Sequence, residues 1–223
     1  CLGGDGSFLR AVRYIRDSGV PIVGINTGRL GFLSNISKES IAETFQLLED
    51  GHFEFQKRSL IRVQTQDDLF GEENFALNEL TLSKKDTASM ISVHAHLDGK
   101  YLNSYWADGL IVSTPTGSTG YSLSCGGPII MPGTNNIIIT PNAPHNLNVR
   151  PIVIDDNSVV KLKVEDRDQL ALVSLDSRSR AFDSDTELII KKADFKIKLI
   201  QPQNNSFTAT IRHKLMWGLD KRS

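Results

Sequence analysis

The chain has 223 residues, with 25 lysines and arginines against 26 aspartates and glutamates. This length suffices for one large or two smaller domains with a buried core, and the near-zero net charge disfavours nucleic acid as a partner. Cys1 and Cys125 are too few for a disulfide framework, so we expect a cytoplasmic location. No apolar run reaches the roughly 18 residues that cross a bilayer, and no secretion signal is recognisable, so no membrane association is expected.

The first part of the chain alternates between helical and extended patterns. Residues 7–17 have apolar side chains at helical spacing, with Ser7 where an N-cap belongs, and residues 37–51 repeat this pattern. Between them, residues 20–25 form a short apolar run that is typical of a buried strand. The alternation predicts a parallel α/β unit over residues 1–52. Because the chain begins with what reads as the end of a strand, we expect further sequence upstream.

From residue 53 the apolar period changes to two, which predicts an antiparallel sandwich or barrel over residues 53–202. Asp98-Gly99 is typical of a tight hairpin turn that needs positive φ. A final helical pattern predicts that residues 203–223, with Gly218 as a helix stop, pack back on the first domain. The expected strands are 59–65, 75–83, 91–97, 101–106, 110–113, 136–140, 152–154, 159–164, 170–175, 187–192 and 195–200.

The first candidate site is the glycine-rich turn Gly3-Gly4-Asp5-Gly6, between a strand end and a helix start. Glycines let a ligand approach the backbone, and the free amides of a helix N-terminus favour phosphate. A carboxylate beside a phosphate is useful when it accepts a proton from an attacking hydroxyl group or faces a cation, as in phosphoryl transfer. The alternative is an ordinary strand-to-helix turn in which Asp5 stabilises the helix dipole.

The second candidate site is a loop rich in hydroxyl groups and glycine over residues 113–122, directly after an apolar strand. Neutral donors suit a pyrophosphate or ribose hydroxyl groups, and Tyr121 is placed to stack on a base. A plain surface loop is the alternative, but such a loop has no reason to be this long and this free of charge.

Further polar residues interrupt apolar strands. Asn78 and Glu79 are neighbours and point to opposite faces, so we expect at least one of them to face the core or a ligand cleft; a solvated edge strand is the alternative. Asp108 precedes the strand that leads to the hydroxyl-rich loop. His94 and His96 share a strand face, but without a third ligand nearby they are interpreted as ordinary sheet residues.

In chain order, the motifs are Gly3 to Gly6, Gly24 to Leu33, Asn78-Glu79, Asp108 to Thr119 and Gly126-Gly127-Pro128. As an ordered set they resemble the NAD kinase family. The resemblance implies a Rossmann-like first domain, a β-sandwich second domain and NAD bound in the cleft between them. It further implies phosphorylation of the 2′-hydroxyl of the adenosine ribose of NAD by ATP, another triphosphate or polyphosphate, with Mg²⁺ held by the triphosphate and a homodimer or homotetramer as the assembly.

The resemblance also implies roles for individual residues, with Asp5 as the proton acceptor for the 2′-hydroxyl. Trp106, where many relatives have a basic residue, and Gly120, where alanine is common, depart from the family pattern. The expected NAD-binding residues are Asp5, Gly6, Arg10, Phe32, Asn78, Glu79, Asp108, Thr119, Gly120, Tyr121, Ser122, Leu123, Ser124, Ala143, Asp176 and Arg178. The residues expected to contact phosphate are Gly3, Gly4, Thr116, Gly117 and Ser118, and no protein-held metal is expected.

Two other functions are compatible with parts of the sequence. A lipid or sugar kinase can share the glycine-rich turn, although the neutral hydroxyl-rich loop argues against it. A dinucleotide-binding sensor without catalysis is the second alternative, and the intact Asp5 argues against that. The phosphoryl donor and the acceptance of NADH stay open.

Overall fold

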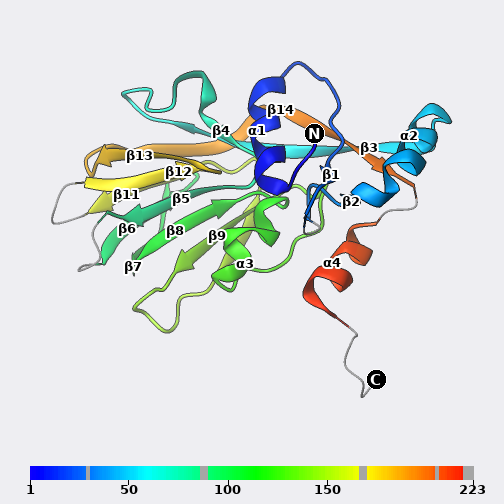
Figure 1. Cartoon of the computed structure of the whole chain (residues 1–223). Coiled ribbons are helices and arrows are strands. Elements are labelled where there is room, and N and C mark those ends of the chain that lie inside the picture. Colours follow the sequence, from blue (N-terminus) through cyan, green and yellow to red (C-terminus); the bar gives the residue numbers. More distant parts are fainter. Residues whose placement is uncertain (29–30, 86–89, 166–169, 204–205, 218–223) are drawn as a thin grey trace. The chain divides into compact units, whose positions relative to one another are not determined.

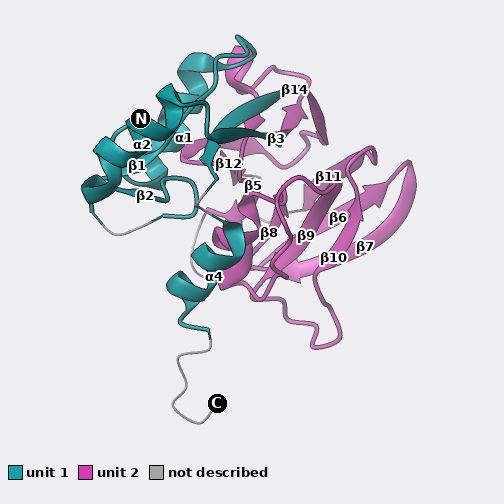
Figure 2. Cartoon of the chain, turned by 90° about the vertical axis from the view of Figure 1, so that its right-hand side faces the viewer, with its two compact units in different colours: residues 1–58, 196–223 teal, residues 59–195 magenta. Residues whose placement is uncertain are grey.

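A computed structural model describes residues 1–28, 31–85, 90–165, 170–203 and 206–217. Arg29 and Leu30 of the Gly24 to Leu33 motif and the expected helix stop Gly218 lie outside these residues. The chain forms two compact units, one of residues 1–58 and 196–223 and the other of residues 59–195 (Figure 2). The expected domain boundaries after residues 52 and 202 stay a prediction, and the last helix is grouped with the N-terminal unit.

The first unit opens with helix α1 (Asp5–Ile15), which buries Phe8 and Val12 and matches the helix expected here. The expected cap at Ser7 is wrong, because the helix begins at Asp5 and Gly4 is its N-cap. Gly4 is extended and has no side chain to cap with, so the first amides are free of a side-chain cap and Asp5 lies in the first helical turn.

After α1, two short strands, β1 (Ile25–Asn26) and β2 (Ile36–Ser37), pair with each other in parallel. Leu2, which precedes α1, forms an isolated parallel bridge with Ile25. The strand expected over residues 20–25 is therefore much shorter than predicted. Pro21 supplies no amide for a strand ladder, and Ile22 instead bridges to Leu199.

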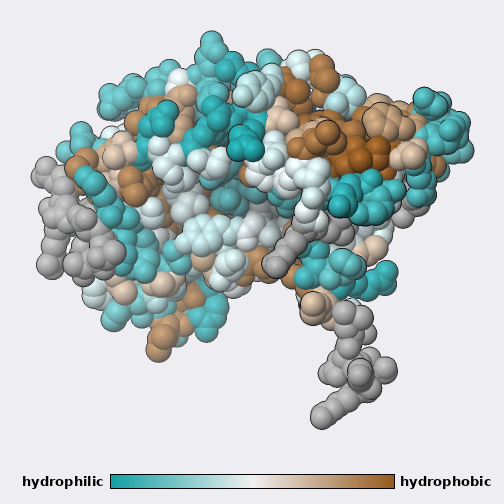
Figure 3. All heavy atoms as spheres, viewed as in Figure 1, coloured by the Kyte–Doolittle hydropathy of each residue, from teal (hydrophilic) through white to brown (hydrophobic). Residues whose placement is uncertain are grey.

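Three further helical elements complete the first unit. A 3₁₀ turn, η1 (Lys38–Ser40), leads into α2 (Ile41–Glu49). Helix α4 (Phe207–Leu215) follows its N-cap Ser206, whose side chain accepts a hydrogen bond from the backbone amide of Ala209. Phe45 of α2 and Phe55 of β3 are half-exposed, and hydrophobic atoms gather over these two elements in Figure 3.

Antiparallel strands dominate the second unit, as predicted (Figure 1). One six-stranded sheet has the order β10-β9-β8-β5-β12-β13 and the other has the order β4-β3-β14-β11-β6-β7. The strands are β3 (Phe53–Gln64), β4 (Phe75–Ala76), β5 (Glu79–Lys84), β6 (Ile91–Leu97), β7 (Lys100–Ala107), β8 (Gly109–Ser113), β9 (Asn136–Asn142), β10 (Ile152–Asp155), β11 (Val160–Glu165), β12 (Leu170–Leu175), β13 (Arg178–Asp183) and β14 (Leu188–Pro202). Short turns η2 (Gly71–Glu73) and η3 (Gly117–Thr119) and helix α3 (Tyr121–Ser124) interrupt them.

Both sheets contribute to one apolar core, which confirms the predicted sandwich. Leu80 and Leu82 from one sheet and Ile91 and Val93 from the other belong to this core and have no exposed surface. Asp98 and Gly99 both have positive φ, as the predicted hairpin turn requires. Within the described residues, no helix has the length and apolar character that spanning a bilayer would need.

Candidate active site

Asp5 is held in one orientation by three successive backbone amides. Its Oδ2 accepts a hydrogen bond from the amide of Phe32 (2.9 Å), and its Oδ1 accepts from the amides of Leu33 (3.0 Å) and Ser34 (2.9 Å). A carboxylate offers about four acceptor sites, so capacity to accept another hydrogen bond remains on Oδ2. The arrangement fixes an oriented acceptor at the first turn of α1.

Glycines surround this carboxylate for different reasons. A Cβ at Gly31 would overlap the Asp5 carboxylate, so this position must stay free of a side chain. Gly3 has φ +137°, which disfavours other residues. A Cβ at Gly4 or Gly6 would meet no described atom within 4 Å, so the backbone there is open to a ligand.

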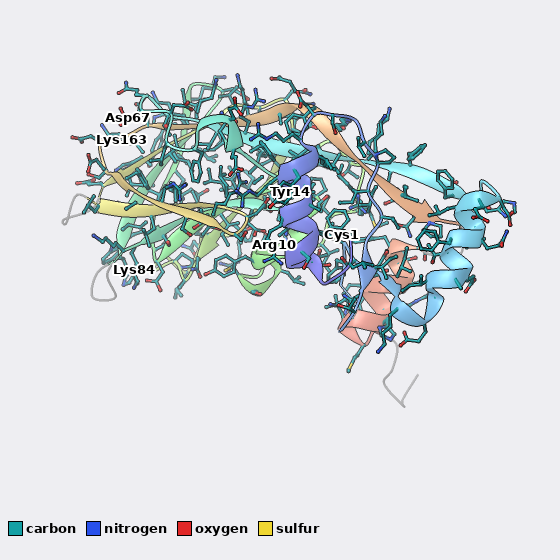
Figure 4. The ribbon with its side chains drawn as sticks, turned by 45° about the horizontal axis from the view of Figure 1, so that its top comes forward. Cys1, Arg10, Tyr14, Asp67, Lys84 and Lys163 are labelled. Carbon is teal, nitrogen blue, oxygen red and sulfur yellow. The ribbon has the colours of Figure 1, made fainter. Side chains whose placement is uncertain are left out.

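Arg10 and Phe32 are the other predicted site residues of the first unit. Arg10 projects from α1 and donates to the hydroxyl of Ser7 at 3.2 Å (Figure 4). The ring of Phe32 lies 6.3 Å from that of Phe207 and 5.2 Å from the ammonium of Lys214. The loop that holds Asp5 therefore also contacts α4.

In the second unit, Asn78 and Glu79 lie at the start of β5, where Glu79 pairs with Ser113 of β8. Asn78 Oδ1 and Glu79 Oε2 are buried and have no hydrogen-bond partner among the described residues. Buried polar atoms are normally paired, so these two atoms mark a place where a polar ligand would complete the structure.

Burial and the nearby Asp176 raise the pKa of Glu79 to about 8, and the backbone N–H of Tyr121 acts in the opposite direction. Burial also raises the pKa of Asp176, although three amides and Arg178 favour its charged form. Because those amides stabilise the charge on Asp176, we assign the retained proton to Glu79. A protonated Glu79 can donate one hydrogen bond to a ligand.

The hydroxyl-rich loop contains η3 and the start of α3, and several of its hydroxyl groups form hydrogen bonds within the protein. Ser118 donates to the carbonyl of Pro115 (2.7 Å), and Ser122 pairs with Thr140 (2.8 Å); both side chains are fully buried. Thr119 donates to the carbonyl of Thr116 at 3.3 Å. These hydroxyl groups shape the loop.

Three positions of this loop lie close to the Asn78-Glu79 pair or to solvent. A Cβ at Gly117 would overlap the carbonyl oxygen of Asn78, and a Cβ at Gly120 would lie 2.9 Å from Glu79 Oε2. Tyr121 is 43% exposed, and its hydroxyl group accepts a hydrogen bond from the side-chain Nδ2 of Asn142 at 2.9 Å. An exposed ring with a fixed hydroxyl group suits stacking on a base.

Asp108 directly precedes β8, and Ala143 directly follows β9, the strand that pairs with β8. Asp108 forms an ion pair with Lys84 at 2.6 Å, and its amide donates to the carbonyl of Asn142. Ala143 is exposed with φ +46°. The rings of Trp106 and His145 lie 4.3 Å apart. Lys84, labelled in Figure 4, thus balances the charge of a predicted ligand residue.

Leu123 and Ser124 complete the expected NAD-binding run in α3, with Ser124 exposed and Leu123 partly buried. Arg178 is different, because its side chain is buried and donates to the backbone carbonyls of Glu73, Phe75 and Leu175. That Arg178 and Asp176 contact NAD stays a prediction, since both side chains make extensive contacts with the protein itself.

Sequence reasoning did not select Gly31, Thr114 or Asn142 as site residues. Gly31 lies inside the Gly24 to Leu33 motif, so the sequence did point to a place near the functional carboxylate. Thr114 lies inside the candidate loop over residues 113–122, so the sequence pointed to its surroundings but not to its own role. Asn142 acts on Tyr121 through a hydrogen bond for which the local sequence offers no signal. The described residues contain no group of three or more His, Cys, Asp or Glu side chains able to hold a metal ion.

Comparison with known families and proteins agrees with this geometry. Residues 1–53 match the model of the ATP-NAD kinase N-terminal domain, and residues 77–202 match that of the ATP-NAD kinase C-terminal domain. NAD kinases of Cytophaga hutchinsonii and Christiangramia forsetii are 51% and 54% identical to this chain. Each match covers 100% of this chain and 76% of the relative.

Solved structures show the same likeness. A yeast NADH kinase complexed with NADH matches with a TM-score of 0.87 at 26% identity, over 97% of this chain and 65% of that one. An NAD kinase from Archaeoglobus fulgidus in complex with ATP matches with a TM-score of 0.79 at 30% identity, over 96% of this chain and 81% of that one. From the domain matches and from relatives about half identical along its whole length, the chain belongs to the NAD kinase family.

Proposed function

We propose that this protein phosphorylates the 2′-hydroxyl of the adenosine ribose of NAD and produces NADP, with ATP or another triphosphate as donor. The observation that carries this proposal is Asp5, a carboxylate oriented by three amides at a helix start beside glycines with open backbone. The membership of the family and the similarity to kinases bound to NADH and to ATP support it.

In the proposed reaction, Asp5 accepts the proton of the 2′-hydroxyl as that oxygen attacks the terminal phosphorus of the donor. The bond between this phosphorus and the bridging oxygen breaks, and the nucleoside diphosphate leaves. Phosphoryl transfer needs positioning and charge stabilisation more than covalent help. The amides of Phe32, Leu33 and Ser34 keep the carboxylate still, while Gly4 and Gly6 offer open backbone to phosphate oxygens.

NAD is proposed to bind through the buried amide of Asn78, the carboxyl group of Glu79 and the ring of Tyr121. The unpaired oxygens of Asn78 and Glu79 are suited to ribose or base groups. We include Arg10, Phe32, Asp108, Ala143 and the run from Thr119 to Ser124 in this proposal.

A divalent metal, most simply Mg²⁺, belongs to the same proposal. Both oxygens of Asp5 already accept hydrogen bonds from backbone amides. Asp5 is therefore better suited to an outer-sphere contact with the metal than to direct coordination. The triphosphate oxygens would hold the metal, which supplies charge neutralisation during transfer.

The free thiols Cys1 and Cys125 support our proposal of a reducing, cytoplasmic location.

The test is to incubate the full-length protein with NAD, Mg²⁺ and ATP and to assay NADP with a dehydrogenase that reads NADP alone. We expect NADP to form, and Asp5→Asn to lower kcat by roughly 100-fold or more while NAD still binds, as general bases typically contribute. Asp17→Asn is the matched control, because Asp17 follows the same helix and is exposed.

The alternatives give different outcomes in the same assay. NAD binding without NADP formation from any donor would indicate a dinucleotide-binding sensor, and phosphorylation of a lipid or sugar in place of NAD would indicate the related kinase class. Unchanged turnover in Asp5→Asn would remove Asp5 from the mechanism while leaving the overall activity intact.

A further inference from the structure

The turn between β12 and β13 directs two charged side chains at one short segment of backbone, residues 73–79. Asp176 stands in this turn with φ +51°, a conformation that non-glycine residues seldom adopt. Such strain persists where the surroundings fix it, and it is common near functional sites. The contacts of Asp176 show what fixes it here.

The carboxylate of Asp176 accepts hydrogen bonds from three consecutive backbone amides that lie much earlier in the sequence. Oδ2 accepts from Leu77 at 3.0 Å, and Oδ1 accepts from Asn78 at 2.8 Å and from Glu79 at 3.3 Å. The amide of Asp176 in turn donates to the carbonyl of Glu79 at 3.0 Å. One residue thus holds the backbone from which the Asn78 and Glu79 side chains project.

Arg178 extends this hold toward the start of the segment. Its guanidinium donates to the carbonyls of Glu73 and Phe75 and lies 5.4 Å from the centre of the Phe75 ring. The planar fork of arginine can bridge two carbonyls in a fixed geometry. Because the side chain is 8% exposed, little of it is open to a ligand.

Thr114 binds the carbonyl side of the same backbone. Its Oγ1 donates to Leu77 O at 2.5 Å, and its amide donates to Asn78 O at 2.9 Å. Gly117 donates its amide to Thr114 Oγ1 at 3.1 Å, and a side chain at Gly117 would overlap the carbonyl of Asn78. The hydroxyl-rich loop is therefore attached to the segment that Asp176 holds.

We propose that Asp176, Arg178 and Thr114 are positioning residues, which form a clamp that holds the Asn78-Glu79 backbone so that its buried, unpaired side-chain oxygens face the dinucleotide. In this proposal Asp176 and Arg178 act through the protein, in place of the direct contacts with NAD that the family resemblance implies. In the ligand-free protein, the buried oxygens Asn78 Oδ1 and Glu79 Oε2 have no hydrogen-bond partner among the described residues, which costs free energy of folding. The clamp keeps these oxygens in place despite that cost. This inference rests on the proposed function to the extent that Asn78 and Glu79 bind NAD.

The first test is Asp176→Asn, with Asp183→Asn at the exposed end of β13 as its matched control. We expect KM for NAD to rise about tenfold or more, because hydrogen bonds to a charged acceptor are lost, while kcat changes much less. The control should match the wild type. A fall in kcat with unchanged KM would overturn the clamp, since it would place Asp176 in the reaction.

The pH profile of KM separates positioning from mere loss of stability. The charged or polar groups that face Glu79 are Asp176 from the β12–β13 turn, with Arg178 behind it, and the Tyr121 N–H from α3. Removing the charge of Asp176 should shift the titration assigned to Glu79 to lower pH, from its wild-type value of about 8. A profile that does not move would contradict the coupling.

Hydrogen exchange tests the clamp without any reference to NAD. The amides of Leu77, Asn78 and Glu79 should exchange faster in Asp176→Asn than in the wild type, and unchanged protection would overturn the proposal. If the wild type forms no NADP, the proposed function fails, yet this exchange result still decides whether the clamp exists.

A second pair of variants applies if Asp176→Asn does not fold. Thr114→Val keeps the shape and removes the hydroxyl group, so KM for NAD should rise, whereas Thr114→Ser keeps the donor and should restore most of the affinity. Equal behaviour of these two variants would contradict a role for the Leu77 hydrogen bond. Arg178→Lys should also raise KM, because lysine cannot bridge the carbonyls of Glu73 and Phe75 in the same way.

Discussion

At the scale of single residues, two aspartates use the same device for different ends. Asp5 and Asp176 each accept three consecutive amides. Asp5 lies at a helix start beside open glycine backbone, which suits proton transfer. Asp176 lies in the β12–β13 turn, where its amide donates to the carbonyl of Glu79 and Arg178 stabilises its charge. The surroundings of a carboxylate, rather than its hydrogen-bond count, separate the proposed catalytic role from the positioning role.

Gly31→Ala should lower kcat at least about tenfold, because the added Cβ would overlap the Asp5 carboxylate and push it from its place. The measurement is steady-state NADP formation. Gly28→Ala in the same loop is the control, since its Cβ would meet Asn26 at an ordinary 3.9 Å. Equal kcat values for the two variants would show that the position of Asp5 tolerates this shift.

Glu79 makes stability depend on pH. Its pKa is raised from 4.5 to about 8 in the folded protein, so its contribution is complete below pH 4.5 and is lost as the pH rises toward 8. Between pH 5 and 8 the wild type should therefore lose unfolding free energy relative to Glu79→Gln, on the order of a few kcal/mol.

Urea unfolding at several pH values measures this difference. Glu49→Gln, on the exposed surface of α2, should follow the wild type. Parallel curves for the wild type and Glu79→Gln would show that Glu79 has an ordinary pKa in the folded state.

At the scale of elements, the two-residue period of apolar side chains in the sequence predicted most of the strands but not all of them. β13 has the sequence Arg-Ser-Arg-Ala-Phe-Asp, and its middle positions are exposed, so alternation gives no signal there. Two strands expected over residues 187–192 and 195–200 form the single strand β14, because Ala193 stays buried and the ladder continues past Asp194. Edge position and tertiary burial decided both cases.

The last helix provides a prediction at this scale. Ser206 accepts a hydrogen bond from the amide of Ala209 at 3.2 Å and caps α4. Ser206→Ala should lower the unfolding free energy by about 1 kcal/mol, as lost N-caps do, whereas Ser206→Asp should keep the cap. Thermal or urea unfolding of the three proteins checks this, and equal stability of all three would remove the cap's contribution.

At the scale of the whole molecule, each six-stranded sheet ends in two outer strands whose far edges pair with no other strand among the described residues. β10 and β13 are the outer strands of one sheet, and β4 and β7 are those of the other. Exposed edges favour pairing with another chain, and we therefore keep the proposal of a homodimer or homotetramer. Sedimentation should give a mass that is two or four times 24.7 kDa, and a monomer at working concentrations would contradict it.

The sequence by itself determined the fold class, the order of the motifs and the family, because apolar period and glycine-rich turns are local properties of the chain. The partners of its carboxylates were decided by the tertiary structure. Asp5 binds amides 27 to 29 residues away, and Asp176 binds amides 97 to 99 residues away. Which amides face a carboxylate depends on how distant strands and turns meet, and no local pattern contains that information.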